Sequence, residues 1–174
     1  MTKPTDDLGR ELVIAIDPGV HGCGVAFLIN GKLKAAYYVP TNTESLIRDD
    51  MIDLHEVKAT EACFILEKPQ IYKTRLLKGD PNDLIDVAVA GGEMLGRLYD
   101  IVVWHVSRER ITVEKIVPAV WKKQLPKEVV QERVKPKLTP QELACVVKPK
   151  PASLMHNVWD AVGIGLWGVK RFVP

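Results

Sequence analysis

The stretch VIAIDPGVHGCGVAFLI, residues 13–29, joins an apolar run to an aspartate, a proline and a glycine-rich turn. The run at 13–16 is continuous, which is typical of a strand buried on both faces. Asp17 therefore sits at the C-terminal end of a buried strand, where a carboxylate is costly unless another group compensates its charge. Either a side chain of the protein or a bound ligand must provide that compensation. An aspartate that only forms a turn is the simpler alternative.

The composition predicts one soluble domain over residues 1–174, since 47% of the residues are hydrophobic and 26% are charged. No apolar run approaches the roughly 20 residues that span a bilayer, so we expect no membrane partner. The polar first residues lack the apolar segment of a secretory signal. The three cysteines are isolated and form neither a disulfide framework nor a metal-ligand pattern. We therefore expect a cytoplasmic protein in a reducing compartment.

Hydrophobic runs and turn signals along the chain predict a mixed sheet covered by helices. The predicted strands are 12–17, 22–30, 32–39, 62–69 and 100–106, and the predicted helices are 43–60, 83–99 and 153–172. Asn30-Gly31 is a strong hairpin signal, and Ser153 is a candidate N-cap of the last helix. The segment Thr139–Glu142 is typical of a helix start with proline in its first turn. The order predicts an α/β fold in which three antiparallel strands precede two further strands.

Three carboxylates in this order have apolar neighbours. Glu67 ends a second buried strand, and Asp160 lies among apolar residues of the last helix. If the strands that carry Asp17 and Glu67 are parallel neighbours, their acids meet at the sheet edge where α/β proteins bind ligands. Crowded carboxylates repel one another, and a divalent cation such as Mg²⁺ removes that penalty. Two such ions about 4 Å apart can drive phosphodiester hydrolysis. A surface ion pair of Glu67 with Lys68 or Lys73 is the alternative.

Three segments, IAIDPGVHGCGVAF, ILEKP and HNVWDAVGIGLW, resemble the acidic motifs of the RuvC group of Holliday-junction resolvases, within the RNase H-like superfamily. VPAVWKKQLPKEV is similar to the segment that precedes the final helices in phage-type relatives. The resemblance implies a single RNase H-like nuclease domain with a mixed five-stranded sheet, three antiparallel strands then two parallel. It also implies a homodimer that uses Mg²⁺ or Mn²⁺, two ions per active site, to nick branched DNA. Such a protein would work in a bacterial cytosol or a phage-infected cell.

Carried over to this sequence, the resemblance makes Asp17, Glu67 and Asp160 the catalytic residues and metal ligands. The family has a fourth ligand, Asp or His, three positions before the last aspartate. Here that position is Asn157, and His156 precedes it. Both positions share a helix face with Asp160. We favour His156 because imidazole is a better ligand than a neutral amide; a helix-start residue with no ligand role is the alternative.

The net charge is only +2, yet the basic residues gather in clusters, which would permit one basic face. Lysine and arginine can neutralise phosphates there, and a tyrosine can stack on an unpaired base. The predicted DNA-binding residues are Lys68, Tyr72, Lys73, Arg75, Lys78, Lys122 and Lys123. Ordinary solvated loops are the alternative.

Glycines and tryptophans near the motifs have two interpretations each. Gly19, Gly22 and Gly24 would let the backbone approach a phosphate or a metal-bound water, or they form a plain tight hairpin. Trp121 and Trp159 are predicted to lie in the core or in a dimer contact rather than to stack on bases.

The main prediction is a structure-selective endodeoxyribonuclease that cleaves four-way junctions by two-metal hydrolysis. A catalytically weak module that only binds branched DNA is one alternative, and an RNA-processing nuclease of the same fold is another. Actin-like kinases and ATPases also place an Asp-x-Gly turn at Mg-phosphate, but they need a duplicated fold and a longer chain.

Overall fold

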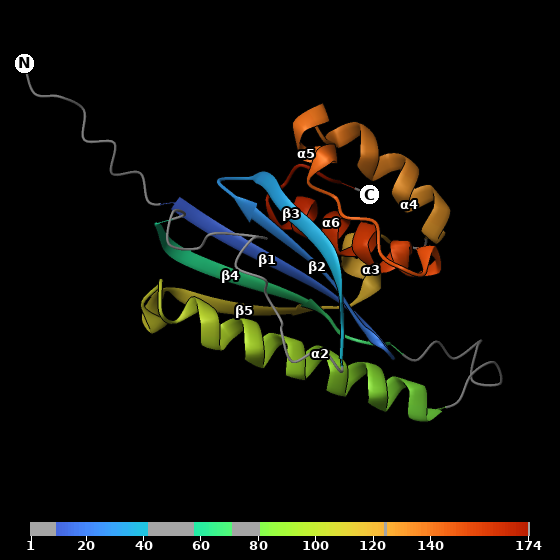
Figure 1. Cartoon of the computed structure of the whole chain (residues 1–174), viewed down its shortest axis with the longest axis horizontal. Helices are drawn as coiled ribbons and strands as arrows, with labels where there is room; N and C mark the ends of the chain where they lie inside the picture. Colours follow the sequence, from blue (N-terminus) through green and yellow to red (C-terminus); the bar gives the residue numbers. More distant parts are fainter. Residues whose placement is uncertain (1–9, 42–57, 71–80, 124, 174) are drawn as a thin grey trace, which may run out of the picture.

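The computed structural model describes residues 10–41, 58–70, 81–123 and 125–173, which form one sheet with helices on both faces (Figure 1). The five strands lie in the order β3-β2-β1-β4-β5. They are β1 (Arg10–Gly19), β2 (Gly22–Ile29), β3 (Lys32–Pro40), β4 (Ala59–Glu67) and β5 (Ile111–Ile116). Neighbours among β1, β2 and β3 are antiparallel, whereas β4 is parallel to both β1 and β5. The predicted mixed five-stranded α/β sheet is confirmed.

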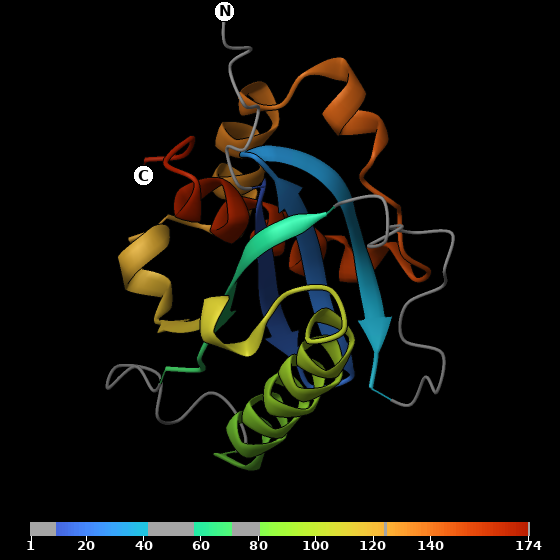
Figure 2. The same ribbon diagram turned by 90° about the vertical axis from the view of Figure 1, so that its left-hand side faces the viewer.

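The helices divide unequally between the two faces of the sheet. They are α2 (Pro81–Val102), α3 (Pro118–Trp121), α4 (Lys127–Val134), α5 (Pro140–Ala144) and α6 (Met155–Gly168). The long helix α2 runs along one face, and the other four gather on the opposite side (Figures 1 and 2). None of the helices in the described part combines the length and the apolar character that crossing a bilayer requires.

The central strand β1 contributes to two separate cores. Ile14 and Ile16 pack in the cluster that α2 covers, while Val13 and Ala15 pack in the cluster beneath α6. Side chains alternate between the faces of a strand, so a strand covered on both faces needs apolar residues at every position. The continuous apolar run at 13–16 has this cause.

The predicted strand at 100–106 is wrong. Helix α2 continues through its first residues, and Leu98, Val102 and Val106 follow one another at intervals of four along the buried side. That spacing places these side chains on one side of the helix and of the turn that follows it. Their packing overrides the preference of β-branched residues for a strand. The last strand is instead β5, which sits at the sheet edge and buries only Ile116 of its six residues. An edge strand with so few buried residues gives almost no hydrophobic signal.

Helix starts were predicted with mixed success. Thr139 caps α5 as predicted: its hydroxyl accepts a hydrogen bond from the Glu142 N–H, and its own N–H donates to the Glu142 carboxylate. Ser153 does not cap the last helix, because it belongs to a 3₁₀ turn (Ala152–Leu154) and α6 begins at Met155. The predicted helix at 43–60 lies outside the described residues, apart from 58–60, of which the last two belong to β4.

A buried acid ties the small helices to the rest of the fold. The Glu142 carboxylate accepts hydrogen bonds from the Arg171 guanidinium (2.5 Å) and from the Leu33 N–H (2.9 Å). The Arg171 hydrogen bond lowers the pKa of Glu142 to about 2. Arg171 also donates to the carbonyl of Gly31 (2.7 Å). The β2–β3 turn, α5 and the chain end are thus joined at one point.

Candidate active site

The first two predicted acids lie side by side at one edge of the sheet. Ile16 of β1 pairs with Leu66 of the parallel strand β4, so Asp17 and Glu67 follow at the same level. Asp17 is only 6% exposed, and Asp160 of α6 is 2% exposed. Each of these buried charges requires a compensating partner.

Two glycines allow α6 to approach this edge. A Cβ atom added to Gly24, the partner of Asp17 in the β1–β2 register, would lie 2.0 Å from the backbone oxygen of Asn157. A Cβ on Gly19 would lie 2.7 Å from the side-chain nitrogen of Asn157. These glycines therefore make room for the helix, a role that the sequence did not indicate. The close approach brings the first turns of α6, and with them Asp160, to the end of β1.

A lysine joins the acids. The Lys122 ammonium lies 2.7 Å from Asp160 Oδ2 and 3.7 Å from Glu67 Oε2. The Trp121 indole N–H donates a hydrogen bond to Glu67 Oε2. The negative charge of Asp17 also acts on Lys122 and favours its protonated form. Carboxylates from β4 and α6 therefore contact one ammonium, and the carboxylate of β1 is near enough to act on its charge.

Burial and neighbouring charges both shift the pKa values of Glu67 and Lys122. Burial raises the pKa of Glu67, and this outweighs the opposite effects of Lys122 and the Trp121 N–H. Burial lowers the pKa of Lys122, but Glu67 and Asp160 together reverse this effect and the pKa is raised overall. Both groups therefore bind protons more tightly than usual, Glu67 because it is buried and Lys122 because carboxylates lie beside it.

The donor set fits a hard divalent cation, although the carboxylates are not arranged around one. Among the described residues, no three His, Cys, Asp or Glu side chains form a group that could hold a metal ion. Lys122 lies between Glu67 and Asp160 instead. Two buried oxygens, Oδ1 of Asp160 and Oδ1 of Asn157, have no hydrogen-bond partner in the described part of the chain. Carboxylate and amide oxygens with spare lone pairs are the ligands that Mg²⁺ prefers.

The two candidates for a fourth ligand differ in their surroundings. His156 is half-buried, and its Nδ1 lies 2.7 Å from the carbonyl oxygen of Ser153. A carbonyl only accepts, so Nδ1 carries the proton and Nε2 keeps its lone pair. Asn157 is buried, and its side chain faces Gly19 in the turn that follows Asp17. The role of His156 as a ligand stays a prediction, and Asn157 is the residue that the fold packs against the β1–β2 turn.

The predicted DNA-binding residues are only partly described. Lys68 is exposed directly after Glu67, and Lys123 is exposed directly after Lys122. Tyr72, Lys73, Arg75 and Lys78 lie outside the described residues. Their contacts with DNA stay predictions.

Sequence reasoning missed the two contacts made by the segment VPAVWKK. Lys122 pairs with two of the predicted acids rather than facing open solvent. Trp121 is fully buried, as predicted for a core residue, but its N–H also holds Glu67.

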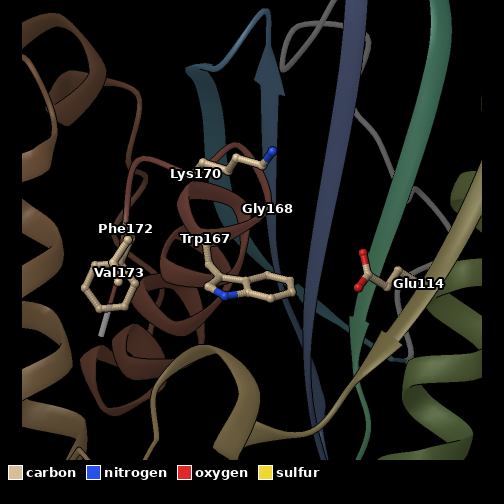
Figure 3. A pocket seen from close by; sticks show the side chains of 6 residues that line it. All are labelled: Glu114, Trp167, Gly168, Lys170, Phe172 and Val173. Carbon is tan, nitrogen blue, oxygen red and sulfur yellow. The ribbon is translucent and has the colours of Figure 1, made fainter.

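A separate pocket lies between β5 and the end of α6 (Figure 3). Its volume is about 360 Å³, and it is lined by Glu114, Trp167, Gly168, Lys170, Phe172 and Val173. It contains none of the predicted site residues. The carboxylate cluster therefore remains the candidate site.

Neither a protein-family model nor a curated protein matches the sequence. Among solved structures, the chain is similar to RuvC of T. thermophilus in complex with a Holliday junction substrate. The TM-score is 0.50 at 17% identity, over 91% of this chain and 96% of that chain. The fowlpox virus Holliday junction resolvase has a TM-score of 0.45 at 11% identity, over 92% of this chain and 99% of that one. The yeast mitochondrial Holliday junction resolvase Ydc2 has a TM-score of 0.44 at 13% identity, over 91% of this chain and 79% of that one. The first of these likenesses confirms the predicted fold, which this chain shares with the T. thermophilus RuvC.

Proposed function

We propose that this protein is a metal-dependent endonuclease that cleaves branched DNA, with four-way junctions as its main substrate. The observation that carries the proposal is that Asp17 and Glu67 lie at the same level at the C-terminal edge of β1 and β4, where Lys122 joins Glu67 to Asp160 of α6. Ligands bind at this edge in open α/β sheets. The fold shared with RuvC supports the choice of a nuclease over other chemistry at such an edge.

Asp17, Glu67 and Asp160 would hold two Mg²⁺ or Mn²⁺ ions, with His156 or Asn157 as a further ligand. When bound, such ions lower the pKa of a water and stabilise charge on the leaving oxygen. The protein supplies the positions of the ligands.

The surroundings of the acids keep their geometry fixed. The Trp121 N–H orients the Glu67 carboxylate, and the contact at Gly24 holds α6 against β2. Burial of Asp160 excludes competing water from one of its oxygens. Side chains held by such contacts can position a phosphodiester without much further ordering.

A cleavage assay tests the proposal directly. Labelled four-way junction, flap, linear duplex, single strand and RNA–DNA hybrid are incubated with the protein in Mg²⁺, in Mn²⁺ and in EDTA. We expect nicking of the junction with either metal and none in EDTA. Binding of the junction without nicking would favour the weak binding module, and preferential cleavage of the hybrid would favour an RNA-processing nuclease.

Two symmetric nicks in a junction need two active sites, and α2 offers a surface for a second copy. Ile85 and Val89 are 61% and 52% exposed on this helix. Gly92 and Gly96 follow on the same side, and a Cβ atom at either would meet open space. If the α2 helices of two copies pack antiparallel, with the symmetry axis between Val89 and Gly92, each Val89 lies against Gly92 of the second copy. Each Ile85 then lies against Gly96 of the second copy. Such large-to-small matching allows close helix packing, so the proposed homodimer forms through this stripe.

Val89→Glu should convert the dimer into a monomer. The substitution puts two unpaired charges into one symmetric interface, and we expect dimerisation to weaken by at least about 100-fold. Light scattering coupled to size-exclusion chromatography measures the mass. Val147→Glu is the matched control, because Val147 is 47% exposed and lies outside α2. A wild-type protein that is monomeric at all concentrations, or a dimer that survives Val89→Glu, would contradict this interface.

A further inference from the structure

We propose that Lys122 is a built-in counter-cation that holds Glu67 and Asp160 together in the metal-free protein, and that a divalent ion binds by displacing it. Lys122 then sets the metal concentration at which the site fills. The inference rests on the proposed function in one respect, since it takes the same acids to be the metal ligands.

The ammonium is held from several sides. It donates a hydrogen bond to Asp160 Oδ2 at 2.7 Å, lies 3.7 Å from Glu67 Oε2, and sits 4.7 Å from the centre of the Trp121 ring. The exposed fractions are 13% for the Lys122 side chain, 12% for Glu67 and 3% for Asp160. A surface ion pair contributes little because water screens it, but this pair is largely shielded.

The backbone of Lys122 is anchored beside the acids. Trp121 is fully buried and donates its N–H to Glu67, and its ring also fills the space that faces Gly163 of α6. Lys122 follows immediately as the C-cap of α3, so its side chain starts close to the carboxylates. Only the flexible four-carbon stem has to move for the ammonium to leave.

An ammonium and a divalent ion cannot share these oxygens. The hydrogen bond to Asp160 Oδ2 uses the lone pairs that a metal ion would need about 2 Å away. Three positive charges within a few ångströms in a shielded site repel strongly. The two cations compete for Asp160 Oδ2, and the flexible four-carbon stem lets the ammonium be the one that leaves.

If the two cations exchange, removing the ammonium should lower the stability of the metal-free protein and raise its affinity for the metal ion. Without Lys122 the carboxylates repel each other in the absence of metal, so the metal-free protein loses stability. The metal ion then has no competitor for Asp160 Oδ2 and Glu67 Oε2, and the lone pairs of these two oxygens become more exposed. A lysine that merely supports the fold would lower stability without raising metal affinity.

The test compares Lys122→Met, which keeps an unbranched apolar side chain but removes the ammonium, with Lys34→Met at an exposed lysine of β3. Calorimetric titration with Mn²⁺ and thermal unfolding in EDTA are measured on each full-length protein. We expect Lys122→Met to bind Mn²⁺ at least about tenfold more tightly than wild type and to unfold at a lower temperature in EDTA. Lys34→Met should match wild type in both measurements. Equal or weaker Mn²⁺ binding by Lys122→Met would overturn the inference.

A second measurement uses the wild-type protein and does not depend on the variant's folding. Mg²⁺ is titrated into protein with labelled lysine side chains, and the Lys122 resonance is assigned by its loss in Lys122→Arg. We expect this resonance to move to the position of exposed lysines as Mg²⁺ binds. A resonance that stays in place while Mg²⁺ binds would overturn the inference but leave the proposed nuclease intact. Absence of metal binding in every variant would overturn both.

Discussion

Asp17→Asn should abolish cleavage of a four-way junction while the variant still binds it. Asp17 ends the buried strand β1 beside Glu67, and its charge is one of three that act on Lys122. An amide has nearly the same shape, but it cannot balance the charge of a divalent ion or bind one firmly. We expect cleavage to fall by at least about 10³-fold, as for loss of a group that acts in the transition state.

Junction binding should persist in this variant because the substitution removes a negative charge from a surface that faces phosphates. Like charges repel, so the affinity in EDTA should equal or exceed that of wild type. Single-turnover cleavage in Mg²⁺ and a gel-shift titration in EDTA measure the two effects separately. Glu114→Gln removes an acid from β5, outside the cluster, and should leave both unchanged. A variant of Asp17 that cuts as fast as wild type would remove this residue from the mechanism.

The elements that could be predicted are those in which local pattern and tertiary role agree. The run at 13–16 is apolar because β1 has a core on each side, and the Asn30-Gly31 turn joins β2 to β3 as its sequence indicates. The strand prediction at 100–106 failed because local pattern and tertiary role conflict there. β-branched residues favour a strand, but the spacing of Val102 and Val106 lets the helix and its turn bury them.

The site divides in a similar way. Carboxylates next to apolar runs are conspicuous, because burying a charge needs a reason, so Asp17, Glu67 and Asp160 stood out. The partner did not stand out, since nothing local distinguishes Lys122 from Lys123. Only α3, which buries Trp121 and turns the next residue toward the acids, separates the two lysines. The role of Gly24 was also hidden, because a strand glycine shows its purpose only when the helix packed on it is known.

Gly24→Ala should be strongly destabilising for that reason. The new methyl group would lie 2.0 Å from the backbone oxygen of Asn157 and 2.9 Å from the Val158 nitrogen. Backbone atoms in the first turn of a packed helix cannot step aside as a flexible side chain can, so α6 would have to move away from β2. We expect a loss of about 3 kcal/mol or more in the free energy of unfolding. Asp160 would move with the helix, so the residual folded protein should also lose cleavage.

Gly96→Ala is the matched control, because it adds the same methyl group where a Cβ would meet only open space. Alanine is favoured over glycine inside a helix by about 1 kcal/mol, so this variant should gain stability. Both substitutions are made in the Val89→Glu background, which keeps changes in dimerisation out of the comparison. Urea unfolding followed by far-UV circular dichroism gives the two free energies. If Gly24→Ala unfolded at the same urea concentration as its parent, α6 would not rest on β2 at this point, and the placement of Asp160 beside Asp17 and Glu67 would lose its structural basis.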